Sequence, residues 1–137
     1  MRSEKIRFVG TAVPLFLRKD EPGAQVTNAM DTIIWLAIMI PISLLFTGIG
    51  IYAWRRKKPM WFWSGSTVKE SEISDVAAYN RANGIMWLAY SSVFWLCAGL
   101  GALNLDIAGL VLAAGCLGGI PVLIIVYKKI YDKYRKE

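Results

Sequence analysis

The chain has 137 residues, of which 55% are hydrophobic, and it carries 16 Lys and Arg against 10 Asp and Glu. That length allows one domain at most, and the apolar content is high for a soluble domain, so composition favours a membrane protein. The sequence has no histidine, the commonest general base and a frequent metal ligand, so we expect no enzyme activity, no metal and no cofactor. We expect the excess positive charge to face the lipid bilayer and not a nucleic acid.

The first thirty residues contain no stretch long enough to span a bilayer. Residues 6–17 are mostly apolar, but Gly10 and Pro14 interrupt them and the charged residues 18–21 follow at once. A spanning helix needs roughly 20 apolar residues. We interpret residues 1–30 as an N-terminal extension or an interfacial segment, with Met30 as an alternative natural start, and residues 31–137 as a single membrane domain.

Three later segments are long and apolar enough to cross a bilayer. They are residues 32–54, 84–103 and 105–127, and Asp106 is the only Asp, Glu, Lys or Arg in their sequences. At about 1.5 Å per residue, roughly 20 helical residues cover the hydrocarbon core. Backbone groups that face lipid must bond within their own segment, so these segments are predicted to be helices. The predicted fold class is an all-α integral membrane protein with three transmembrane helices.

The second and third spans are joined by little more than Asn104-Leu105-Asp106, so they are predicted to form a tight antiparallel hairpin. Small residues at four-residue spacing let helices approach closely, and they serve a homo-oligomer equally well. Cys97 and Cys116 are isolated in apolar spans, where a thiol acts as a small hydrophobe, and we expect no disulfide. The candidate helix-packing residues are Ala98, Ala102, Gly109, Ala113, Gly115 and Gly119.

A basic run ends the first span and sets the topology. Arg55, Arg56, Lys57 and Lys58 form both a topology signal and an expected contact with anionic lipid. The loop at residues 55–83 and the tail at residues 128–137 together hold eleven Lys and Arg, so we place both in the cytoplasm. The N-terminus is then outside the cell. The aromatic residues 61–63 after the run are predicted to lie along the membrane interface.

An interfacial loop or helix is predicted before the second span. Thr67 and Glu70 fit a capping box, and a start near Asp75 is the alternative. On the helix that follows, Asn80, Asn83 and Trp87 share one face. Polar side chains that enter a membrane need partners, which are either the loop and interfacial water or a bound ligand or protein.

The loop and the second span also resemble a known family. The run Trp63-Ser64-Gly65-Ser66-Thr67-Val68-Lys69, then Asp75, Tyr79-Asn80-Arg81-Ala82-Asn83-Gly84 and Trp87, resembles the segment before a transmembrane helix in SdpI-like and related small multi-pass membrane proteins of Gram-positive bacteria. Ser66 stands where those proteins often have a basic residue. The resemblance implies immunity to a membrane-active toxin, or a related signalling role, without catalysis.

We therefore expect a cell-membrane protein with a binding or regulatory role, such as self-protection against a membrane-active bacteriocin. The alternative is a subunit of a small oligomeric transporter or channel, and a membrane-protein partner fits either role. The candidate binding residues are Trp61, Trp63, Gly65, Thr67, Tyr79, Asn80, Asn83 and Trp87.

Overall fold

Three long helices make up the computed structural model, which describes residues 22–62 and 67–137, with side chains from residue 28 onward. They are α1 (Pro22–Arg55), α2 (Val76–Leu103) and α3 (Leu105–Tyr134), and a short 3-10 helix, η2 (Glu70–Glu72), lies in the loop before α2. All three long helices are apolar and long enough to cross a membrane. The predicted all-helical fold with three candidate spans is confirmed, while the apolar run at residues 6–17 lies outside the described residues.

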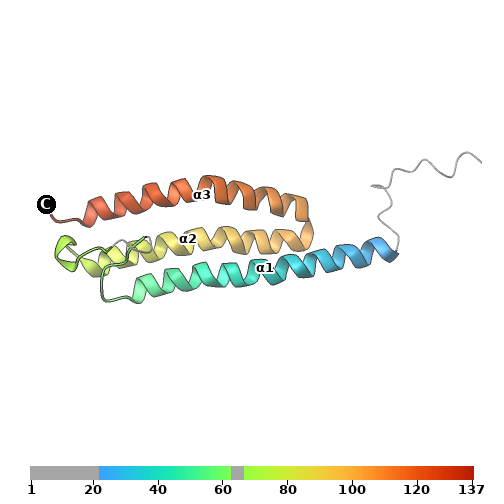
Figure 1. The fold of residues 1–137 in the computed structure, drawn as a ribbon, viewed down its shortest axis with the longest axis horizontal. Coiled ribbons are helices and arrows are strands. Elements are labelled where there is room, and N and C mark those ends of the chain that lie inside the picture. The colour runs from blue at the N-terminus through green and yellow to red at the C-terminus, as the bar shows by residue number, and fades with distance from the viewer. Residues whose placement is uncertain (1–21, 63–66) are drawn as a thin grey trace, which may run out of the picture.

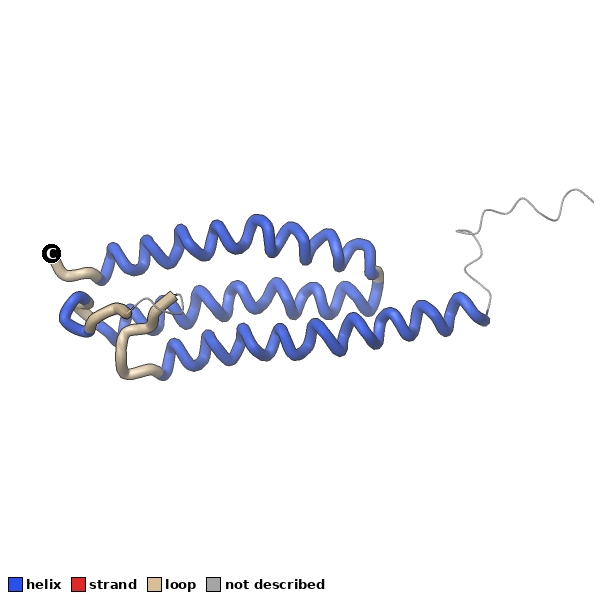
Figure 2. The backbone as a smooth tube through the Cα atoms, in the orientation of Figure 1, coloured by secondary structure: helices blue, strands red, loops and turns tan. Residues whose placement is uncertain are grey.

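Helix α2 lies between α1 and α3 (Figure 1). The loop after α1 and the C-terminus lie at one end of the bundle, and the turn between α2 and α3 lies at the other. Helix α1 runs without interruption past the proposed boundary at residues 30 and 31, and its first turns project beyond that turn (Figure 2).

Local signals explain where the helices begin and end. Pro22 starts α1, a position where its missing N–H costs no hydrogen bond. Asp75 caps α2 by accepting from the Ala78 N–H at 2.9 Å, so the helix uses the later of the two predicted starts. Asn104 alone joins α2 to α3, and its side chain caps α3 by accepting from the Ile107 N–H at 3.0 Å. The predicted tight hairpin is confirmed.

Helices α1 and α2 approach closely where two glycines meet. A Cβ atom added to Gly84 would lie 2.8 Å from the backbone oxygen of Gly50, a distance that real Cβ atoms do not tolerate. Farther along the pair, the ring of Phe46 stacks on that of Phe94, with 4.7 Å between centroids, and meets Tyr90 edge to face at 5.4 Å. Aromatic packing and a glycine contact therefore hold this pair together.

The contact between α2 and α3 uses some of the predicted packing residues. A Cβ atom on Gly115 would press on Val93, and one on Gly119 would press on Tyr90. Ala98 is buried in a cluster with Met39 and Cys97, and Val111 and Leu112 of α3 pack against that cluster. Both thiols, Cys97 and Cys116, are free. The other predicted packing residues contribute less to this contact. Ala102 and Ala113 are exposed, and a Cβ atom on Gly109 would meet nothing within 4 Å.

Candidate functional site

The loop that leaves α1 is held by the side chain of one asparagine on α2. Asn80 is fully buried, and its Oδ1 accepts from the Met60 N–H at 2.8 Å. Its Nδ2 group donates to the backbone oxygens of Arg56 and Lys58, each at 2.8 Å. Both donor hydrogens of the amide and its oxygen are therefore in use. Asn80 serves to fix the backbone of the basic run.

Tyr79 ties the same loop to α3. Its hydroxyl donates to the backbone oxygen of Met60 at 2.9 Å and lies 3.0 Å from the hydroxyl of Tyr127. The side chain of Tyr79 is fully buried, in a cluster with Ala53, Met60 and Ile73. The loop, α2 and α3 therefore share one hydrogen-bonded core at this end of the bundle.

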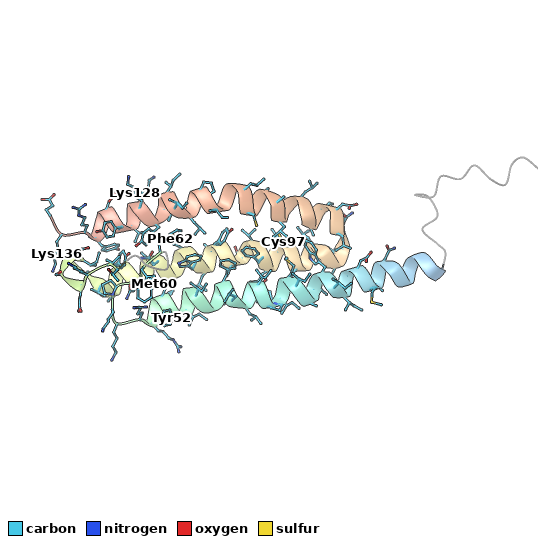
Figure 3. The ribbon with its side chains drawn as sticks, viewed as in Figure 1. Tyr52, Met60, Phe62, Cys97, Lys128 and Lys136 are labelled. Carbon is cyan, nitrogen blue, oxygen red and sulfur yellow. The ribbon has the colours of Figure 1, made fainter. Side chains whose placement is uncertain are left out.

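The C-terminal tail is bonded to the segment before α2. The Ser74 N–H donates to the backbone oxygen of Tyr134 at 2.7 Å, and the Lys136 N–H donates to that of Glu72 at 2.8 Å. Between these bonds, Ile73 pairs with Arg135 as an isolated antiparallel bridge. Lys136 lies beside the loop in Figure 3. The cations of the loop and of the tail therefore share one end of the molecule.

A shallow pocket of about 270 Å³, which we call the loop pocket, lies at the loop between α1 and α2. The Arg56 guanidinium lies 3.8 Å from the centroid of the Trp61 ring and donates to the Tyr52 hydroxyl at 2.8 Å. Stacking on a ring leaves the N–H groups at the edge of the guanidinium free to bind an anion. The pocket is lined by Arg56, Lys58, Pro59, Trp61, Thr67, Val68 and Glu70.

Charges of both signs line this pocket without pairing. Glu70 forms no ion pair with Arg56 or Lys58 in the described part of the chain. Lys58, Glu70 and Thr67 are exposed, and Arg56 is half-buried. The pocket therefore offers two cations, a hydroxyl and a separate carboxylate to a ligand at the membrane surface.

Phe62 differs from its predicted place along the interface. Its ring lies 4.8 Å from that of Tyr127 and stacks on that of Trp87 at 5.7 Å, measured between centroids. Figure 3 shows Phe62 between α2 and α3. The prediction is wrong for this residue because two aromatic rings from different helices provide an apolar site for it.

Two predicted binding residues lie in the bundle and not in the pocket. Asn83 is fully buried, and its Nδ2 group donates to the backbone oxygen of Tyr79 at 2.9 Å. Its Oδ1 and the Nε1 of Trp87 are buried atoms without a hydrogen-bond partner in the structure. No described pocket includes either side chain.

The structure thus divides the predicted site residues into groups. Trp61 and Thr67 line the pocket together with Arg56 and Lys58 of the predicted lipid contact. Arg55 and Lys57 are exposed beside the pocket without lining it. Trp63 and Gly65 lie outside the described residues. Sequence reasoning took Glu70 only as a capping residue, and no signal in the sequence places it in one pocket with Arg56 and Lys58.

No protein-family model, curated protein or solved structure matches the chain. Among the described residues, no group of three or more Cys, Asp or Glu lies close enough to hold a metal ion.

Proposed function

We propose that the protein is a non-catalytic binding protein of the cell membrane, and that its ligand site is the loop pocket. The observation that carries this proposal is that one pocket is lined by predicted lipid-contact residues, Arg56 and Lys58, and by predicted binding residues, Trp61 and Thr67. Arginine, lysine and a hydroxyl are the groups with which proteins bind phosphate. The ligand is therefore a phosphate-bearing group at the membrane surface.

The hydrogen bonds that hold the loop backbone beside the pocket support a binding role. Asn80 and Tyr79 form four hydrogen bonds with the loop backbone between Arg56 and Met60. A backbone fixed in this way presents Arg56 and Lys58 from set positions, which lowers the entropy lost when a ligand binds.

The biological role we propose is self-protection against a membrane-active bacteriocin. The loop motif resembles that of SdpI-like proteins, which implies such a role. Cationic peptides bind membranes partly through the anionic lipid surface. A protein that binds phosphate groups of the inner leaflet leaves fewer of them to a peptide that has crossed to that face.

We propose further that the pocket faces the cytoplasm. The loop and the tail carry eleven Lys and Arg, and hydrogen bonds between Ser74 and Tyr134 hold them at the same end of the bundle. Cytoplasmic loops of membrane proteins carry an excess of such residues. The turn at Asn104, which has no cation, then faces outward.

Growth of a bacterial host that expresses the protein tests the role. Nisin and melittin serve as probe peptides, and the inhibitory concentration is measured with and without the protein. We expect protection with the native chain and with Lys57→Gln, and its loss with Lys58→Gln or Thr67→Val. Lys57→Gln is the matched control, because it removes the same charge from a neighbouring exposed residue outside the pocket.

Expression of each variant is checked by immunoblot of the membrane fraction. Equal killing with and without the native protein for both peptides would contradict the protective role. Peptide-independent flux of ions through the protein in liposomes would instead favour the transporter or channel subunit.

A further inference from the structure

The loop pocket combines two cations with a carboxylate that neither of them neutralises. Arg56, Lys58 and Glu70 all line this pocket. Glu70 forms no ion pair with either cation in the described part of the chain. A ligand with negative charge alone would gain from the cations and be repelled by Glu70. A ligand that carries a positive group next to its phosphate would gain from all three.

We propose that this pocket binds a zwitterionic phosphoethanolamine group, a phosphate diester that carries a primary ammonium. This inference rests on the proposed function, since it names the ligand class of the same site. The phosphate contacts Arg56, Lys58 and the hydroxyl of Thr67, and the ammonium contacts the carboxylate of Glu70.

Size and chemistry both agree with such a ligand. A pocket of about 270 Å³ is open enough for a headgroup but small for a whole lipid. Arg56 already stacks on Trp61 and bonds to Tyr52, so its guanidinium is oriented before the phosphate arrives. An ammonium bearing three N–H donors suits Glu70, an exposed carboxylate that pairs with no cation in the described part of the chain.

We place the phosphoethanolamine group on a lipid and not on a soluble metabolite. The pocket begins at Arg56, one residue after the end of the first span, and Trp61, which also lines it, is 37% exposed. Tryptophan at the end of a span marks the depth of the lipid headgroups. A headgroup of the surrounding leaflet therefore reaches the pocket without leaving the membrane.

Native mass spectrometry of the full-length protein released from detergent tests the ligand class. The protein is incubated with an equimolar mixture of phosphatidylethanolamine and phosphatidylglycerol that have the same acyl chains. One exposed ion pair supports only a modest preference, so we expect about two- to fivefold more phosphatidylethanolamine bound. Glu70→Gln should abolish or reverse this ratio, and Lys58→Gln should weaken the binding of both lipids.

Two variants control for general changes in charge. Lys57→Gln removes a cation beside the pocket, and Asp106→Asn removes an acid from the opposite end of the bundle. Both should leave the ratio of the two lipids unchanged. If an equal concentration of water-soluble glycerophosphoethanolamine displaces the bound lipid, the proposal that the phosphoethanolamine group belongs to a lipid is wrong.

The outcomes separate this inference from the proposed function. If phosphatidylglycerol binds better and its binding still depends on Lys58, the zwitterionic ligand is wrong while the phosphate site stands. If Glu70→Gln leaves the native ratio unchanged, the ligand class is also wrong. If no bound lipid depends on Lys58 or Thr67, both proposals fail.

Discussion

A Cβ atom on Gly84 of α2 would lie 2.8 Å from the backbone oxygen of Gly50 on α1. The two helix backbones therefore meet where the polar first turns of α2 give way to its apolar span. This contact sets how close Asn80, one turn earlier, stands to the loop that leaves α1.

The first prediction concerns this contact. Gly84→Ala should destabilise the protein by about 1–3 kcal/mol, because the methyl group meets backbone atoms and a nearby part of Trp54 that cannot move aside. Gly99→Ala is the control, since a Cβ there meets nothing within 4 Å. Removing a helical glycine at an open position should stabilise the protein by about 0.5–1 kcal/mol. Thermal unfolding in detergent, followed by circular dichroism, measures both, and equal midpoints would contradict the close contact.

The second prediction concerns the hydrogen bonds by which Asn80 holds the loop backbone. Asn80→Asp keeps an acceptor for the Met60 N–H but removes the donors for two backbone oxygens, which then face a carboxylate. A buried polar group left without its partner costs about 1–3 kcal/mol. We expect a lower unfolding midpoint and faster proteolysis within the loop.

Asn104→Asp is the matched control for that change. Asn104 caps α3 through its side-chain oxygen alone, and aspartate caps a helix about as well. Its unfolding midpoint should stay near that of the native protein. A loop equally resistant to protease in both variants would show that Asn80 does not fix it.

The third prediction concerns the tail. Ending the chain after Tyr134 removes the Ile73–Arg135 bridge and the bond from the Lys136 N–H to Glu72. We expect hydrogen exchange to accelerate at the amides of residues 72–74, because the segment loses one of its two backbone hydrogen bonds to the tail and therefore opens more readily. The amides in the middle of α2 serve as an internal control and should exchange as before. Unchanged exchange at residues 72–74 would mean that the tail contributes no support.

Much of the fold was predictable because it depends on one-dimensional properties of the sequence. The three candidate spans follow from the length of the apolar segments, and the hairpin follows from the single polar residue, Asn104, between two of them. The extension of α1 back to Pro22 was missed, because residues 22–31 contain no apolar run and their helicity depends on continuity with the span.

The site was predictable only in part, since its contacts join residues far apart in sequence. Asn80 stood out as a polar residue that needs partners, but nothing in the sequence indicates that those partners are the backbone oxygens of Arg56 and Lys58. The hydrogen bonds that join Tyr127 and Tyr131 of α3 to Tyr79 and Glu72 likewise depend on the three-dimensional arrangement of the loop.

The fourth prediction concerns orientation. In a Cys97→Ala, Cys116→Ala background, single cysteines replace Lys57, Asp106 or Glu137, all of which are exposed. A membrane-impermeant maleimide added to intact cells should label only the cysteine at position 106. The cysteines at positions 57 and 137 should react only after the membrane is opened, because the excess of Lys and Arg keeps that end in the cytoplasm. Labelling of positions 57 and 137 from opposite sides of the membrane would contradict the conclusion that the loop and the tail lie at the same end of the bundle.

The most direct test of the central claim is photo-crosslinking with a phosphatidylethanolamine that carries a diazirine on its headgroup. The full-length protein is reconstituted with this lipid, irradiated and mapped by mass spectrometry. If the loop pocket holds a headgroup, the label will concentrate in residues 56–61 and 67–70, and Lys58→Gln will reduce it there while Lys57→Gln will not. Label spread along α3 with none in those two segments would contradict a headgroup site in the loop.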